Sequence, residues 1–198
     1  MEDNNNNNNQ NNPFKFTAQQ LSDIVLTRNS NLIKEYGGLK GIAEALKVDI
    51  NIGLPNSTVE NNGTNPFADR EAVFGRNGPP ETKSAFLNFL TLFKKNDDSK
   101  KVNALRGGES VMISNYDVQV GDVVFLKQGD VICADGIIIQ GQNLKIDESS
   151  ATGEPTPVEK GEGKDQFIIS GTTVSEGVGN FLVTAVGSNS FTGFKIYI

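Results

Sequence analysis

The feature that most constrains the fold is the alternation, between residues 109 and 186, of short apolar runs with turns rich in glycine and aspartate. Short apolar runs with such boundaries predict β-strands. The expected strands cover residues 111–113, 122–127, 131–132, 136–139, 144–146, 167–169, 172–174 and 181–186. Strands at this spacing assemble into a sandwich or a barrel. The sequence therefore predicts a mainly β domain of about seven or eight short strands.

The residues that precede this domain predict short helices instead. Thr17 and Gln20 have the spacing of a capping box, and apolar residues follow at helical period. Asn29 is expected to begin a second helix. The glycines at 37–38 would end it, because glycine accepts the left-handed conformation at a helix C-terminus. An apolar stripe at 39–46 predicts a third helix, which we expect to pack on the neighbouring domain.

Composition divides the chain into three parts. The asparagine-rich tail at 1–13 lacks the apolar groups needed to offset chain entropy, so we expect it to be disordered. Residues 14–93 form the helical region, with a Gly/Asn-rich linker at 49–66 and a short charged helix at 69–77. Residues 94–198 form the β-rich domain.

The bulk composition excludes several classes of function. A net charge of -6 argues against a nucleic-acid partner, because phosphate binding needs clustered lysine and arginine. The chain has no histidine, which excludes imidazole metal sites and Ser-His or Cys-His catalysis. The single cysteine, Cys133, is interpreted as a small buried apolar residue. The apolar run at 86–93 is far shorter than the roughly 20 residues that span a bilayer.

The most informative motif is the run from Asp147 to Pro155, which reads Asp-Glu-Ser-Ser-Ala-Thr-Gly-Glu-Pro. Gly-Asp and Ala-Asp-Gly turns precede it at 121–122 and 134–136, and Ser-Gly-Thr follows at 170–172. In this order and spacing the chain resembles the actuator domain of P-type ATPases. The subfamily it resembles most is the plasma-membrane or vacuolar calcium pump. The resemblance implies a distorted jelly roll, with the N-terminal helices packed against it.

The resemblance also implies a catalytic role for the loop. Glu154 would orient a water molecule and accept its proton as the water attacks an aspartyl phosphate in another domain. Gly153 lets the backbone approach the phosphoryl group, and Thr152 can stiffen the loop through hydrogen bonds to the backbone. Pro155 restricts the backbone of Glu154.

Two further loop residues are expected to act as supports. Asp147 is expected to hold the base of the loop through backbone amides, and Ser149 belongs to the same support. No metal ligand is predicted here. Asp97-Asp98 and Asp147-Glu148 are too few and too scattered for a calcium cage of the EF-hand type.

The sequence departs from the calcium-pump pattern in several places. Ala151 stands where those pumps usually carry leucine or isoleucine, Pro155 where they usually carry serine, and Cys133 where proline is common. The apolar run at 86–93 turns into a charged stretch at 94–101. The chain thus reads as a truncated pump whose first transmembrane hairpin is missing.

Three functions remain open at this point. The chain is an N-terminal piece of a calcium-transporting ATPase, a stand-alone actuator-like protein that regulates an intact pump, or a non-functional remnant. The sequence has no Asp-Lys-Thr-Gly-Thr phosphorylation motif, so the chain alone is expected to be inactive. Its expected partner is a phosphorylation domain, in cis or in trans.

Cofactors and location follow from the same resemblance. ATP, Mg²⁺ and transported Ca²⁺ are implied only for a full-length parent, and no cofactor is expected in this chain. As part of a pump it would lie at the cytosolic face of the plasma membrane or vacuole. As a complete protein it would be soluble and cytosolic.

Overall fold

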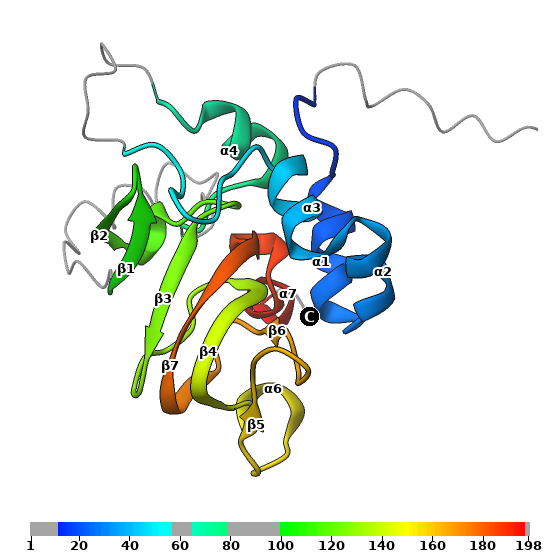
Figure 1. The fold of residues 1–198 in the computed structure, drawn as a ribbon, viewed down its shortest axis with the longest axis vertical. Helices are drawn as coiled ribbons and strands as arrows, with labels where there is room; N and C mark the ends of the chain where they lie inside the picture. The colour runs from blue at the N-terminus through cyan, green and yellow to red at the C-terminus, as the bar shows by residue number, and fades with distance from the viewer. Residues whose placement is uncertain (1–11, 57–64, 79–99, 197–198) are drawn as a thin grey trace, which may run out of the picture.

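The computed structural model describes residues 12–56, 65–78 and 100–196. One antiparallel sheet of seven strands forms its centre, and the N-terminal helices gather beside this sheet (Figure 1). The strand order is β2-β1-β3-β7-β4-β5, and β6 pairs with β4. The mainly β fold predicted from the sequence is confirmed. The strands are β1 (Lys101–Arg106), β2 (Glu109–Ser114), β3 (Val123–Lys127), β4 (Asp135–Asp147), β5 (Val158–Glu159), β6 (Phe167–Ile168) and β7 (Thr173–Ala185).

Two strands are longer than the sequence pattern predicts. β4 and β7 have 13 residues each, and each joins two apolar runs that were expected to form separate strands. Their pairing contains register shifts, one of them between Gln142 and Lys145. Gly177 lies beside this irregularity with a φ of 80°, and a Cβ there would come within 2.3 Å of the Asn143 carbonyl oxygen. Glycine therefore interrupts the apolar pattern without ending the strand.

Strand β1 was not expected, because strands were predicted only from residue 109 onward. It pairs with β2 from Lys101–Ser114 to Arg106–Glu109 and also with β3. Its buried residues are Ala104 and Arg106, and its apolar residues are interrupted by polar ones. The sequence therefore shows no apolar run that would predict this strand. The expected strand at 131–132 is reduced to a single bridge between Val131 and Thr173.

The predicted N-terminal helices are confirmed. Thr17 and Gln20 form the capping box at the start of α1, where each side chain accepts a hydrogen bond from the other residue's backbone N–H. The Asn29 side chain caps α2, and Gly37 adopts the left-handed conformation between α2 and α3. The helices are α1 (Ala18–Leu26), α2 (Ser30–Glu35), α3 (Gly38–Ala45), α4 (Ala68–Phe74), α6 (Ser149–Thr152) and α7 (Phe191–Ile196), with 3-10 turns η1 (Asn115–Asp117) and η2 (Gly187–Asn189).

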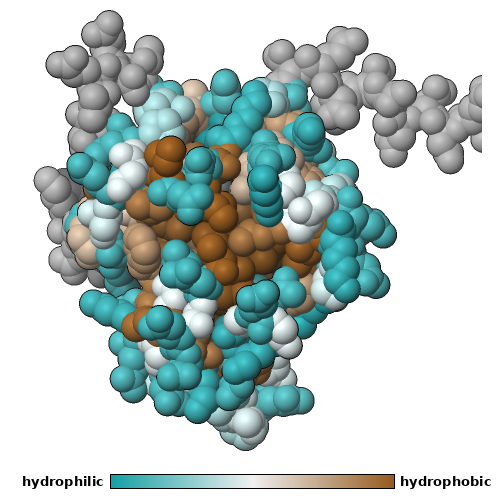
Figure 2. All heavy atoms as spheres, in the orientation of Figure 1, coloured by the Kyte–Doolittle hydropathy of each residue, from teal (hydrophilic) through white to brown (hydrophobic). Residues whose placement is uncertain are grey.

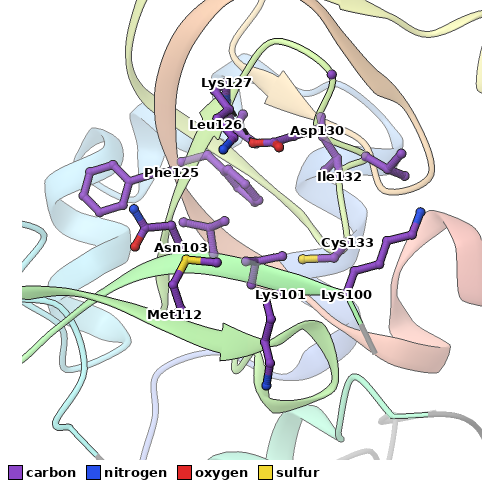
Figure 3. A pocket seen from close by; sticks show the side chains of 15 residues that line it. Lys100, Lys101, Asn103, Met112, Phe125, Leu126, Lys127, Asp130, Ile132 and Cys133 are labelled. Carbon is purple, nitrogen blue, oxygen red and sulfur yellow. Dashed lines mark hydrogen bonds between the residues drawn. The ribbon is translucent and has the colours of Figure 1, made fainter. Parts of the chain in front are cut away.

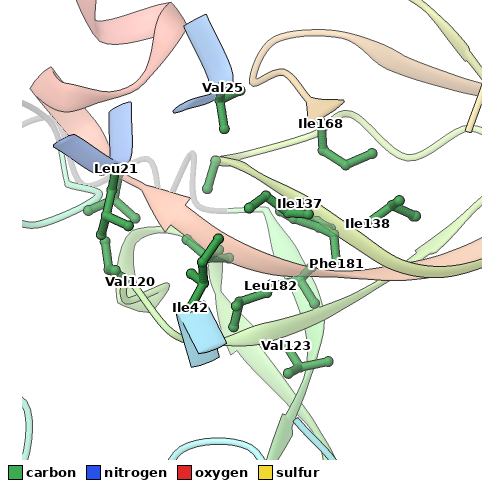
Figure 4. Close-up of a cluster of buried hydrophobic side chains, with 14 of the residues drawn as sticks. Leu21, Val25, Ile42, Val120, Val123, Ile137, Ile138, Ile168, Phe181 and Leu182 are labelled. Carbon is green, nitrogen blue, oxygen red and sulfur yellow. The ribbon is translucent and has the colours of Figure 1, made fainter. Parts of the chain in front are cut away.

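One hydrophobic core joins the helices to the sheet (Figure 4). Leu21 of α1 and Ile42 of α3 belong to the same cluster as Ile137 of β4 and Leu182 of β7, and all four are fully buried. Burial of each such side chain contributes about 1.5–3 kcal/mol to stability. The helical region is therefore part of the folded unit and not an appendage to it.

The expected linker is only partly described. Leu54, which lies within it, is 1% exposed and forms a parallel bridge with Arg106 of β1. This part of the expected linker therefore packs on the sheet. The asparagine tract through residue 11, the segment 57–64, and the segment 79–99 with the apolar run and the expected hairpin junction lie outside the described residues.

Candidate functional site

The motif from Asp147 to Pro155, which we call the signature loop, leaves the sheet at the end of β4. It forms the short helix α6 and then runs exposed toward β5. In Figure 1, α6 and β5 lie together at the lower end of the molecule. Figure 2 shows that this end is mostly polar, whereas apolar side chains gather nearer the centre of the same face.

Hydrogen bonds within the loop fix its base. The Asp147 carboxylate accepts a hydrogen bond from the Ser149 N–H at 2.9 Å. The side chain of Ser149 and then its backbone N–H hold the pKa of the Asp147 carboxyl below its usual range. The Thr152 hydroxyl donates to the Glu148 carbonyl oxygen at 3.1 Å and accepts from the Glu154 N–H at 3.1 Å. The threonine side chain thus connects the start of α6 to the glutamate that follows it.

Gly153 ends α6 in the left-handed conformation, with a φ of 80°. Its N–H donates to the Ser149 carbonyl oxygen at 2.9 Å. Because other residues adopt this conformation only at a cost, glycine is the residue this turn requires. Glu154 and Pro155 come directly after the turn and are both exposed. The arrangement displays a carboxylate on a hydrogen-bonded base.

A buried ion-pair cluster lies beneath the signature loop. Glu148 is 1% exposed, and its two carboxylate oxygens take different cations, Arg28 and Lys160. The Lys160 ammonium lies 2.5 Å from Glu148 and 3.0 Å from Asp165, and it also donates to the Phe167 carbonyl oxygen at 2.7 Å. Arg28 completes the cluster through Asp165 at 2.5 Å. Two cations and two anions therefore balance one another, with Glu148 and Lys160 buried and Arg28 and Asp165 partly exposed.

This cluster was not expected from the sequence. Glu148 was read only as part of the signature loop, and Arg28 lies 120 residues before it. A lysine that is fully buried in a polar stretch, such as Lys160, carries no local signal. Burial works to lower the pKa of the Arg28 guanidinium, but its pairing with Glu148 and Asp165 outweighs burial and raises that pKa.

A separate cavity of about 430 Å³ lies between the β1–β2 hairpin, β3 and the segment 129–133. Figure 3 shows Met112 and Cys133 on opposite sides of it, with the amine ends of Lys100 and Lys101 extending away from its centre. Burial raises the pKa of the Cys133 thiol to about 12, so the residue stays a neutral thiol. The cavity shares no lining residue with the signature loop.

The described ranges contain neither a metal site nor a membrane span that geometry can identify. They hold no group of three or more Cys, Asp or Glu side chains placed to bind a metal ion. Asp97 and Asp98 lie outside these ranges. Among the residues with described positions, no helix is both long enough and apolar enough to cross a bilayer.

Comparison with known proteins identifies the domain. The sequence pattern of the P-type ATPase actuator domain matches residues 96–196. The chain belongs to the P-type ATPase family, and these residues are its actuator domain. The match begins before β1, which is consistent with that strand being part of the domain.

The related proteins are calcium-transporting ATPases. The chain is 54% identical over 108 residues to the calcium-transporting ATPase PAT1 of Dictyostelium discoideum, an alignment that covers 53% of this chain and 10% of that protein. It is 32% identical over 234 aligned residues to the plasma membrane-type calcium-transporting ATPase 9 of Arabidopsis thaliana, covering 86% of this chain and 21% of that protein. Identity to the plasma membrane calcium-transporting ATPase 1 of Mus musculus is 49% over 105 residues, or 53% and 9% of the two chains. The chain thus spans between about a tenth and a fifth of the length of these relatives.

Proposed function

We propose that this chain supplies the actuator domain of an ATP-driven calcium pump and that its signature loop promotes hydrolysis of an aspartyl phosphate. The observation that carries the proposal is the exposed Glu154 carboxylate, displayed on a base that Asp147, Thr152 and Gly153 hold by hydrogen bonds. An exposed carboxylate on an ordered loop can enter the site of another domain.

The chemistry assigned to the loop balances as a hydrolysis. A water oxygen bonds to phosphorus while the bond from phosphorus to the aspartyl oxygen breaks. Glu154 accepts the proton that the water loses, the aspartate leaves as a carboxylate, and inorganic phosphate is released. Gly153 gives the phosphoryl group close access, because it has no side chain. Pro155 and the Asp147–Ser149 hydrogen bond limit the conformations of the loop on either side.

The substrate of this reaction lies outside the chain. The partner is a phosphorylation domain, and ATP, Mg²⁺ and transported Ca²⁺ belong to the complete pump. Actuator domains lie on the cytosolic side of membrane pumps, so we place this one at the cytosolic face of the plasma membrane or vacuole. The purified chain is expected to release no phosphate from ATP.

A chimeric pump tests the role of Glu154. Residues 12–78 and 96–196 replace the N-terminal region and the actuator domain of a calcium-transporting ATPase, so that the helices that share the core are kept. The pump is labelled with radioactive ATP, and decay of the acid-stable acyl phosphate is followed after a chase. Glu154→Gln should slow this decay by about 10²–10⁴-fold, the usual contribution of a general base. Formation of the phosphoenzyme should not change.

The matched control is Glu162→Gln, which removes another exposed glutamate in a neighbouring loop. It should leave the decay rate unchanged. Equal decay rates for the two variants would show that Glu154 takes no part in phosphoenzyme hydrolysis. ATP turnover by the isolated chain, abolished by Glu154→Gln, would instead contradict the assignment of the substrate to another domain.

A further inference from the structure

Arg28 lies at the junction of α1 and α2, far from the signature loop in sequence. Its backbone is left-handed, with a φ of 50°, and its N–H donates to the Val25 carbonyl oxygen as α1 ends. Glycine or asparagine is the usual residue in this conformation. The backbone therefore gives no reason for an arginine, and the reason must lie in the contacts of the side chain.

The Arg28 guanidinium joins two carboxylates with two different nitrogens. Its Nη2 donates to Glu148, and its Nη1 donates to Asp165 at 2.5 Å. A planar guanidinium can make both bonds at once, because its donors form a rigid fork. Arg28 thus connects the N-terminal helices to the segments on both sides of β5.

Glu148 links these ion pairs to the signature loop. Its carboxylate pairs with Arg28 and Lys160. Its carbonyl oxygen accepts hydrogen bonds from the N–H groups of Ala151 and Thr152 at 2.8 and 2.9 Å. One residue therefore both closes the buried cluster and begins α6, so a shift of its side chain would move the first turn of the loop.

We propose that Arg28 is a positioning residue for the signature loop and that the N-terminal helices hold the loop in place through it. Any effect of Arg28 on phosphate hydrolysis rests on the function proposed above for Glu154. The mechanical part of the proposal, that Arg28 holds the loop in place, does not depend on that function. Displacement of α1 and α2 from the sheet would leave Glu148 with Lys160 as its single cation and would loosen the residues that display Glu154.

Amide hydrogen exchange on the full chain tests the mechanical part. Arg28→Asn removes the guanidinium but suits the left-handed backbone, so the helix junction should keep its conformation. The amides of Ala151, Thr152 and Gly153 should exchange about tenfold faster or more, because the hydrogen bonds of a charged group that anchors them are lost. Arg28→Lys, which keeps the charge, should restore much of the protection.

Two comparisons make the result decisive. Arg76→Asn removes an exposed arginine that pairs with the partly buried Glu71, and it should leave loop exchange unchanged. The amide of Val183, bonded to the Asp122 carbonyl oxygen in the core, reports on global stability. Unchanged loop exchange in Arg28→Asn would overturn the proposal. Equal acceleration in the loop and the core would also overturn it, because Arg28 would then act on stability alone. The measurement needs no phosphorylated partner, so it is independent of the chemistry of Glu154.

Discussion

Lys160 should be among the most sensitive polar positions in this chain, and Lys160→Met tests that expectation. Its side chain is fully buried, and its ammonium contacts Glu148, Asp165 and the Phe167 carbonyl oxygen. Methionine preserves most of the volume but leaves Glu148 with one cation instead of two. Removing one partner of a buried ion pair costs about 3–5 kcal/mol.

The structure favours the lower end of that range. Arg28 still contacts both carboxylates in the variant, and Asp165 still accepts the Phe167 N–H at 2.8 Å. We therefore expect a loss of about 3 kcal/mol. In a chain of this size each kcal/mol lowers the unfolding midpoint by about 2–4 °C, so the midpoint should fall by roughly 6–12 °C.

Thermal unfolding followed by circular dichroism measures this shift. Lys145→Met is the matched control, because Lys145 pairs with Glu176 at 2.6 Å on the exposed side of β4 and β7. Surface ion pairs of this kind contribute little to stability, so Lys145→Met should lower the unfolding midpoint far less than Lys160→Met does. The double variant Lys160→Met/Glu148→Gln should lose less unfolding free energy than the sum of the losses in the two single variants, since the two residues share one interaction. Similar midpoints for Lys160→Met and Lys145→Met would refute the argument that burial makes the cluster essential.

Two further predictions concern single residues. Gly153→Ala should cost about 1–2 kcal/mol because of the left-handed backbone, since an added Cβ would meet nothing within 4 Å. Gly78→Ala, which is equally open but has no positive φ, should change the unfolding midpoint little, and equal effects would contradict this account. Cys133, whose thiol has its pKa raised to about 12 from a reference value of 9.0, should react with iodoacetamide on the order of a thousandfold more slowly in the native chain than in urea. The gap follows from the smaller thiolate fraction below both pKa values, and comparable rates would show that the thiol is not held neutral.

Local sequence rules predicted much of this fold, because the features they read are made by residues close together in the chain. The capping box of Thr17 and Gln20 and the left-handed Gly37 are formed within one helical turn. Strand β1 escaped prediction because its apolar residues, Val102, Ala104 and Leu105, are interrupted and flanked by polar or charged ones, and its conformation depends on pairing with β2 and β3. The length of β4 and β7 likewise depends on their mutual pairing, which continues past the glycines that seemed to end them.

The same distinction divides the functional site. The contacts of Asp147 with Ser149 and of Thr152 with Glu154 span two residues each, so a motif can specify them fully. The contact of Arg28 with Glu148 spans 120 residues and depends on how the helices pack against the sheet. A nine-residue motif can therefore define the shape of the loop without defining how firmly the loop is attached. In the function proposed for Glu154 the loop carries its carboxylate into another domain. On that proposal the strength of the attachment determines how accurately Glu154 is presented, so we expect the determinants of its reactivity to extend to the N-terminal helices.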